Sequence, residues 1–366
     1  MAENVSTLAS FAAPPPVAPR LVKALYRENE IIPDWLRVLK WSLAIMAVFT
    51  AYHVIEKFIV HAPHPFIYNP AEFSCRVVGL SHYSVGLLFL LTAHRMRRAS
   101  SLAWFVSLLV LGVMLCVFFY KFGADKNPVL QMLFFLYFII HGYRDMVFFY
   151  RPLSATPGDI ERLRHRILNL TQACLLLSLY FILVPLYLVY LNNRHKFYEP
   201  ELKARIDLLM PYLKLTLLFG WPILLICFVK IWRAIRTFPG GQVWTDNRPI
   251  FLVLISASII FLASPILGVW TFHLLILTHF VGWYLFASRR MSTLPTQSTW
   301  SDGLWKWIRG SVAGFQTLHV GVAVVFLALI LISFLFPSLT LLTVMVNSKA
   351  FYYWNLIHVT ISFAPK

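Results

Sequence analysis

The stretch FQTLHVGVAVVFLALILISFLF, residues 315–336, is 22 residues long and contains no Asp, Glu, Lys or Arg. As an α-helix it is about 33 Å long, which matches the roughly 30 Å hydrocarbon core of a bilayer. A helix that is apolar on every side cannot lie on the surface of a soluble domain. This stretch therefore predicts a transmembrane helix.

The same pattern recurs along the whole chain. Further apolar runs of about this length occupy residues 38–60, 77–95, 101–121, 128–150, 168–192, 210–232, 249–268, 270–288 and, in a shorter form, 350–364. Hydrophobic residues make up 59% of the 366 residues and charged residues only 13%, about half the charged share of a soluble domain. We predict an all-α polytopic membrane protein built as a bundle of about ten transmembrane helices.

The net charge of +17 comes from short basic segments between the apolar runs, not from one continuous basic surface. This distribution argues against nucleic-acid binding and acts as a topology signal. Every second loop is rich in Lys and Arg, which predicts that both termini are cytoplasmic. Residues 1–37 are expected to be a cytoplasmic tail with an interfacial segment, and residues 38–366 a single transmembrane domain. We expect a multi-pass protein of a bacterial inner membrane.

Four histidines lie within predicted spans, each on a different helix: His82, His141, His279 and His358. Imidazole is costly to bury in hydrocarbon, so histidine at membrane depth indicates a functional site. In the predicted topology all four spans run from outside to inside, and the histidines lie about 8 to 20 Å below the outer end. They are expected to converge as metal ligands do in a helix bundle. The alternative is four separate, hydrogen-bonded structural histidines.

The motif HGYRD at residues 141–145 is the most specific local signal. Asp145 follows His141 by four positions, so the two side chains share one face of the helix. The carboxylate is expected to accept a hydrogen bond from the imidazole and to raise its basicity as a ligand, which makes Asp145 the candidate catalytic residue. Alternatively, Arg144 and Asp145 form ion pairs with other helices and hold the bundle together.

Weaker candidates surround the four histidines: His53, His273, Arg144, Asn355 and Trp283. His53 forms a potential ligand pair with Glu56 near the outer end of the first span. The spacing of six residues between His273 and His279 rotates the two side chains apart, so both cannot face one site. Asn355 lies three residues before His358 and is placed to orient it. Trp283 either shields the site or packs in the core.

Several common chemistries are excluded by the sequence. The four cysteines form no CxxC pair, so neither a disulfide framework nor a thiolate zinc site is expected, and they are interpreted as buried structural thiols. No phosphate-binding, dinucleotide-binding, HExxH or GxSxG motif occurs in a suitable context. The HxxxxH and HxxHH clusters of membrane desaturases are also absent.

The order and spacing of the four histidines resemble the Brp/Blh-type β-carotene dioxygenases of bacteria and archaea, over residues 80–360. His82 and His141 are 59 residues apart, His279-Phe280 precedes two arginines, and His358 lies near the C-terminus. The chain departs from the family pattern: no Asp follows the first motif, the His-Gly-x-x-Asp form stands at the second position, and no proline precedes His358. The resemblance implies histidine-bound iron and an apolar polyene substrate.

Together these observations favour a membrane-embedded, histidine-ligated non-haem iron oxygenase. The expected cofactor is Fe²⁺, because imidazole suits iron(II) and leaves positions open for oxygen. The expected partners are membrane lipid and an apolar small molecule, a long lipid or carotenoid-like polyene, that enters from the bilayer. The alternatives are a proton- or ion-coupled transporter, a b-type haem electron carrier with paired histidine ligands, or a lipid-modifying transferase.

Overall fold

A computed structural model of the protein describes residues 32–93, 98–122, 128–150, 242–267, 269–293 and 303–363, with isolated positions elsewhere. Within these ranges every regular element is a helix. Five helices are long and apolar enough to cross a membrane, namely Trp35–Ile59, Pro70–Leu91, Ala99–Lys121, Trp270–Ser292 and Val312–Leu335. The chain is therefore an all-α protein of the membrane type, as the sequence predicted.

The helices follow the predicted spans closely. In chain order they are α2 (Trp35–Val54) with the π-helical turn η1 (Ile55–Ile59), α3 (Pro70–Leu91), α4 (Ala99–Lys121), α5 (Pro128–Tyr150), α8 (Gln242–Leu267), α9 (Val269–Thr293), α10 (Leu304–Gly310), α11 (Val312–Leu335), α12 (Thr340–Val346) and α13 (Ser348–Ser362). Most of the predicted spans 168–192 and 210–232 and most of the predicted tail lie outside the described residues. The short helix α12 was not predicted.

The start of α3 differs from the prediction because two charged side chains are hidden in its first turns. The helix begins at Pro70, where the side chain of Asn69 accepts hydrogen bonds from the next backbone N–H groups. Glu72 and Arg76 form an ion pair of 3.4 Å that is largely buried, and Arg76 also donates to the carbonyl of Val346 at 3.2 Å. The paired charges allow the helix to continue inside the protein, whereas hydropathy alone assigns these residues to a loop.

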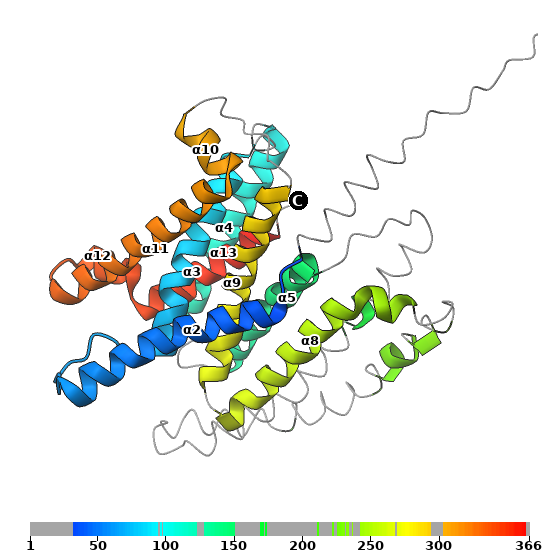
Figure 1. Ribbon diagram of the computed structural model, residues 1–366, viewed down its shortest axis with the longest axis horizontal. Helices are drawn as coiled ribbons and strands as arrows, with labels where there is room; N and C mark the ends of the chain where they lie inside the picture. Colours follow the sequence, from blue (N-terminus) through cyan, green and yellow to red (C-terminus); the bar gives the residue numbers. More distant parts are fainter. Residues whose placement is uncertain are drawn as a thin grey trace, which may run out of the picture.

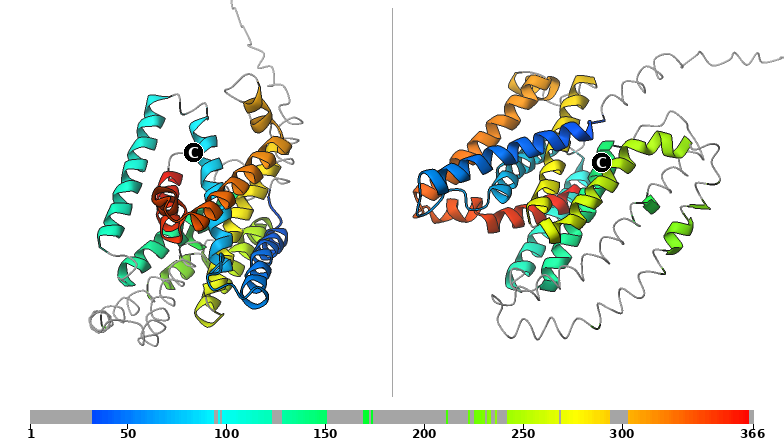
Figure 2. Two further views of the ribbon diagram at one scale, coloured as in Figure 1. Left: turned by 90° about the vertical axis from the view of Figure 1, so that its left-hand side faces the viewer. Right: turned by 60° about the horizontal axis from the view of Figure 1, so that its bottom comes forward.

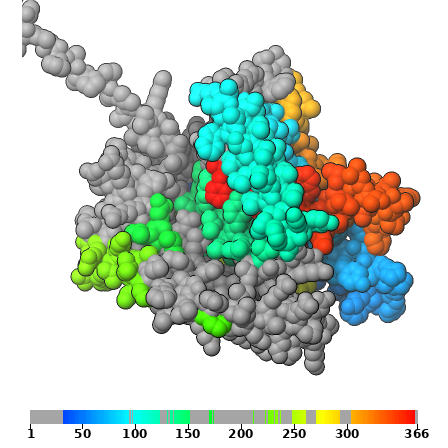
Figure 3. All heavy atoms as spheres, turned by 180° about the vertical axis from the view of Figure 1, so that it is seen from behind, coloured from blue at the N-terminus to red at the C-terminus, as the bar shows by residue number. Residues whose placement is uncertain are grey.

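Helices α3 and α9 stand side by side in the middle of the bundle and run in the same direction (Figures 1 and 2). Helix α2 crosses both, α8 lies against α5 and α9, and α11 packs on α3. Helix α13 runs across α3, so that it is seen nearly end-on in the left view of Figure 2. Helix α4 covers α13 from the outside, as the space-filling view in Figure 3 shows.

Helix α13 is too short to cross a bilayer. Its 15 residues give a length of about 22 Å, less than the roughly 30 Å of the hydrocarbon core. It is preceded by α12, and the side chain of Asn347 between the two caps its first turn by accepting from the N–H of Ala350 at 2.7 Å. The expectation of four parallel histidine-bearing spans therefore does not describe α13, which reaches the centre by crossing its neighbours.

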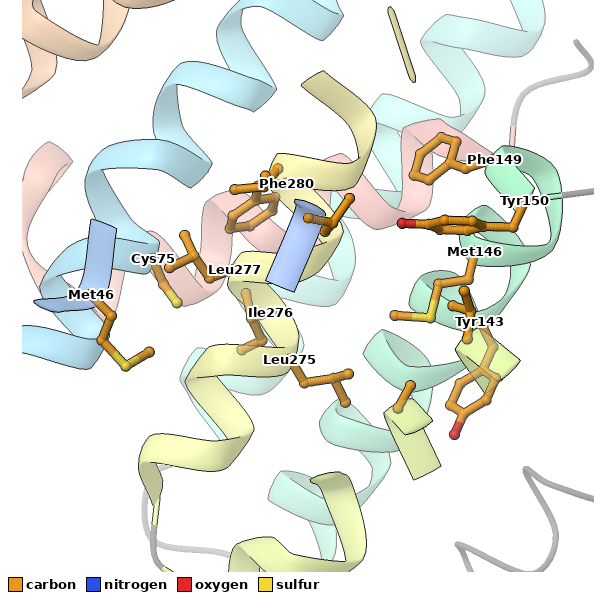
Figure 4. Packing of buried hydrophobic residues seen from close by; sticks show 14 of the residues in the cluster. Met46, Cys75, Tyr143, Met146, Phe149, Tyr150, Leu275, Ile276, Leu277 and Phe280 are labelled. Carbon is orange, nitrogen blue, oxygen red and sulfur yellow. The ribbon is translucent and has the colours of Figure 1, made fainter. Parts of the chain in front are cut away.

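The hydrophobic core surrounds α9, with contributions from α2, α3, α5, α8 and α13. Figure 4 shows part of this core: Leu275, Ile276, Leu277 and Phe280 on α9, Met146, Phe149 and Tyr150 on α5, Cys75 on α3 and Met46 on α2. Cys75 is buried and its thiol donates to the carbonyl of His273 at 3.1 Å, in keeping with the predicted structural role. The core thus fixes α9 against the other helices that carry the predicted histidines.

We predict that Gly79→Ala destabilises this packing. A Cβ at Gly79 would lie 2.7 Å from Phe351 and 2.8 Å from Phe280, so α3 would be pushed away from α13 and α9. The expected loss is about 1–3 kcal/mol of unfolding free energy, measured by chemical or thermal unfolding in detergent. The control is Gly321→Ala on α11, where no described atom lies within 4 Å of the new Cβ. Equal stability of the two variants would contradict the predicted clash.

Candidate metal centre

The four predicted histidines meet inside the bundle, His82 from α3, His141 from α5, His279 from α9 and His358 from α13. The first three have exposed fractions of 2%, 1% and 4%, and His358 is partly buried. Ring centres are 4.8 Å apart for His82–His358, 5.4 Å for His141–His358, 5.1 Å for His141–His279 and 5.6 Å for His82–His279. The four rings therefore form one contiguous cluster, in which each ring has two others as neighbours.

These separations fit one metal ion. An imidazole bound at about 2.1 Å has its ring centre about 3.2 Å from the metal, so two such rings at angles of about 90–120° are roughly 4.6–5.6 Å apart. The Nε2 atoms of His82 and His358 are 3.3 Å apart, close to the roughly 3.0–3.4 Å between two ligand nitrogens on one ion. His82, His279 and His358 form one group of potential ligands, and His141, Asp145 and His279 form another. These residues can hold a metal ion, and the identity of that ion is a separate question.

Ser362 on α13 fixes which nitrogen of His141 faces the centre. Its Oγ donates its only proton to the carbonyl of Val359 at 2.6 Å and lies 2.9 Å from Nδ1 of His141. The hydroxyl oxygen can therefore only accept from Nδ1, which places the proton there and leaves Nε2 with the lone pair. The imidazole is held in the tautomer that a metal ligand on Nε2 requires.

Asp145 takes a position different from the one predicted. It was expected to accept from the imidazole nitrogen of His141 that points away from the metal, but Ser362 occupies that nitrogen. The carboxylate instead faces the ligand nitrogens, with Oδ2 at 3.6 Å from Nε2 of His141 and 3.9 Å from Nε2 of His279. It therefore lies on the metal side of the ring. Neutral imidazoles with one carboxylate form a donor set of net negative charge, which attracts a divalent cation.

A tyrosine that the sequence did not single out supports His358. The ring of Tyr83 stacks on the imidazole with ring centres 4.4 Å apart. Its hydroxyl donates to the amide oxygen of Asn355, whose Nδ2 donates to the carbonyl of Phe351 at 3.1 Å. Asn355 thus reaches His358 only through Tyr83, not by the direct contact that the spacing predicted. No local motif marks Tyr83 or Ser362, because both partners lie on helices remote in sequence.

Aromatic side chains enclose the group. Trp283 contacts His82 with ring centres 4.5 Å apart, although it was predicted from its spacing to His279. Phe280 lies 5.2 Å from His82, and Phe149 lies 6.1 Å from His279. These rings present few polar atoms to the centre. The site is therefore a small polar cluster inside an apolar wall.

Three of the weaker candidates lie away from the cluster. His53 is bonded through Nδ1 to the carbonyl of Ile67 at 2.5 Å, and Glu56 accepts from the N–H of Phe66 and of Ile67, so this pair ties down the loop before α3. His273 is buried but belongs to neither group of potential ligands. Arg144 lies over the ring of Phe363 at 4.7 Å. This contact joins α5 to the end of α13.

The chain matches no protein-family model, no curated protein and no solved structure in the comparisons. The resemblance to the Brp/Blh-type family therefore rests on the order and spacing of the four histidines alone.

We predict that His279→Ala weakens metal binding more than any other single histidine substitution, because His279 belongs to both groups of potential ligands. The loss should exceed the roughly 10- to 100-fold that removal of an outer hydrogen-bond partner costs. The measurement is Co²⁺ or Fe²⁺ titration of the purified protein in detergent. His273→Ala is the matched control, since His273 is also buried and lies on the same helix. Equal metal affinities for the two variants would count against the assigned centre.

Proposed function

We propose that this protein is a membrane-embedded, histidine-ligated non-haem iron oxygenase that acts on a long apolar lipid or a carotenoid-like polyene. The observation that supports it most directly is the buried cluster of His82, His141, His279 and His358 with Asp145, which contains two overlapping groups of potential ligands that share His279. As proposed, the protein lies in a bacterial inner membrane with its N-terminus in the cytoplasm and about nine full spans, because α13 enters the bilayer without crossing it.

The donor set suits iron(II). Imidazole nitrogen is a good ligand for iron, and a carboxylate adds a harder oxygen donor. His82, His141, His279 and His358 would hold the ion, which would bind and activate dioxygen. In the cleavage of one C=C bond into two carbonyl groups, both oxygen atoms would end in the products and the substrate would supply the four electrons. Because Asp145 faces the same side as the ligand nitrogens, its carboxylate can complete the ligand set or hold a proton next to the reacting atoms.

The surroundings suit an apolar substrate. The rings of Phe280, Phe149 and Trp283 enclose the polar cluster and limit the access of water, which protects reactive species from side reactions. His358 is the only partly accessible member of the four histidines. A substrate dissolved in the bilayer would therefore reach the cluster at His358, the histidine that α13 carries.

A b-type haem is a poorer fit. Two imidazoles bound on opposite faces of a haem have ring centres about 6.4 Å apart, twice the ring-to-metal distance, with the macrocycle spread between them. Here the neighbouring rings lie only 4.8–5.6 Å apart, which is too close for a macrocycle between any of these pairs. A proton-coupled transporter would use the His141–Asp145 pair as a relay and would need no metal. Metal analysis therefore separates the transporter from the oxygenase.

The proposal is tested with protein purified from cells grown with iron. We expect about one iron per chain, no haem absorption band, and incorporation of ¹⁸O from ¹⁸O₂ into products of β-carotene or of a long unsaturated lipid. His141→Ala should weaken iron binding and abolish turnover. Absence of stoichiometric iron, combined with unchanged activity of His141→Ala, would overturn the proposal.

Asp145 should matter in a different way from the histidines. Asp145→Asn keeps the size of the side chain but removes its charge and its capacity to take a proton. We expect iron still to bind, with affinity lowered by about 10- to 100-fold, and turnover at saturating iron to fall by a further 10²–10⁴-fold, the usual range for loss of an acid–base group. Steady-state kinetics at saturating iron separates the two effects. Turnover equal to that of the wild type would show that Asp145 takes no part in the reaction.

A further inference from the structure

The outward nitrogen of His82 needs a partner that the four-histidine group does not provide. Its Nε2 faces Nε2 of His358 at 3.3 Å, so Nε2 is the atom directed at the centre. An imidazole that binds metal through Nε2 carries its proton on Nδ1. This Nδ1 is buried, since His82 is 2% exposed, and among the described residues no hydrogen-bond partner reaches it. Metal-bound histidines almost always donate this second N–H to an acceptor.

A fifth buried histidine next to this site has a hydrogen-bond acceptor without a donor. His319 on α11 is 6% exposed, and no described residue bonds to its Nε2. Its Nδ1 lies 3.4 Å from Oγ of Ser81, which donates its only proton to the carbonyl of His319 at 2.9 Å. The serine oxygen can therefore only accept from Nδ1, so Nε2 of His319 is left as a bare acceptor.

The donor and the acceptor are neighbours. Ser81, which holds His319, directly precedes His82 in α3. Trp283 contacts both imidazoles, with ring centres 4.5 Å from His82 and 5.9 Å from His319. A buried donor and a buried acceptor in this relation are commonly joined by one ordered water molecule.

We infer that His319 is the outer hydrogen-bond partner of His82, accepting from its Nδ1–H through a bridging water, and thereby positions this ligand. The inference rests on the metal centre of the proposed function. The predicted topology places His319 near the cytoplasmic end of its span, too far from the four predicted histidines to be joined to them. In the folded chain the contact between α3 and α11 brings it there. His319 would raise the basicity of His82 as a ligand without touching the metal.

The test compares two substitutions of His319 in the full-length protein, with Co²⁺ as the spectroscopic probe. His319→Phe keeps the ring packing against Trp283, Tyr284 and Phe315 but removes the acceptor. We expect it to lower Co²⁺ affinity by about 10- to 100-fold and to shift the visible ligand-field bands. His319→Gln retains an acceptor oxygen and should restore most of the affinity. Wild-type affinity and spectrum in His319→Phe would overturn the inference.

A matched pair of serine substitutions provides a second measurement. Ser81→Ala removes the hydroxyl that holds His319, and it should weaken Co²⁺ binding in the same direction. Ser42→Ala also removes a fully buried hydroxyl that donates to a backbone carbonyl, but no histidine is attached, so Co²⁺ affinity should not change. Equal affinities for the two variants would contradict the assigned tautomer.

The possible failures are distinguishable. If the wild-type protein binds no Co²⁺, or if His279→Ala binds it as well as the wild type, the metal centre is wrong and the role of His319 falls with it. If those two controls behave as expected and His319→Phe matches the wild type, only the role of His319 is wrong.

Discussion

Hydrocarbon offers no hydrogen-bond partners, so every polar group at membrane depth must find one within the protein. Around the centre most of these partners belong to α13. Its Asn355 accepts from Tyr83 of α3, its Thr360 accepts from Tyr137 of α5 at 3.0 Å, and its Ser362 bonds His141 of α5. These bonds hold a short transverse helix between helices that would otherwise meet through apolar surface alone. The position of the histidines depends on this set of contacts.

The centre orients its imidazoles with serine hydroxyls instead of carboxylates. Ser362 and Ser81 each donate to a backbone carbonyl, so each has only a lone pair left for the histidine beside it. A carboxylate in either place would add a second buried negative charge, which is costly in an apolar environment. The neutral hydroxyl achieves the same orientation without that cost. Asp145 is consequently left to face Nε2 of His141, where a bound cation would balance its charge.

Hydropathy predicted the helical class and most helix bounds, because apolar runs of about 20 residues have few other stable states. It assigned the first turns of α3 to a loop, because a hydropathy scale scores each residue separately and does not account for the ion pair between Glu72 and Arg76. The four histidines were found because imidazole at membrane depth is rare. The outer partners Tyr83 and Ser362 and the neighbouring His319 were not predicted from the sequence. Serine and tyrosine cost little free energy to place in a membrane helix, so their presence is no signal, and their contacts join segments that are remote in sequence. Asp145 was found, but its orientation depended on which nitrogen of His141 was already occupied.

The crossing of α13 also has a consequence for biogenesis. A membrane protein is inserted from its N-terminal end, so α3, α5 and α9 reach the bilayer before the helix that carries His358 and Ser362 has been made. Until then the imidazoles of His82 and His141 lack the contacts that α13 provides. The arrival of α13 therefore converts a set of inserted helices into a folded protein with a complete ligand set. In the proposed metal centre, metal loading would follow the arrival of α13 as the last step of assembly, because His358 belongs to one of the two groups of potential ligands.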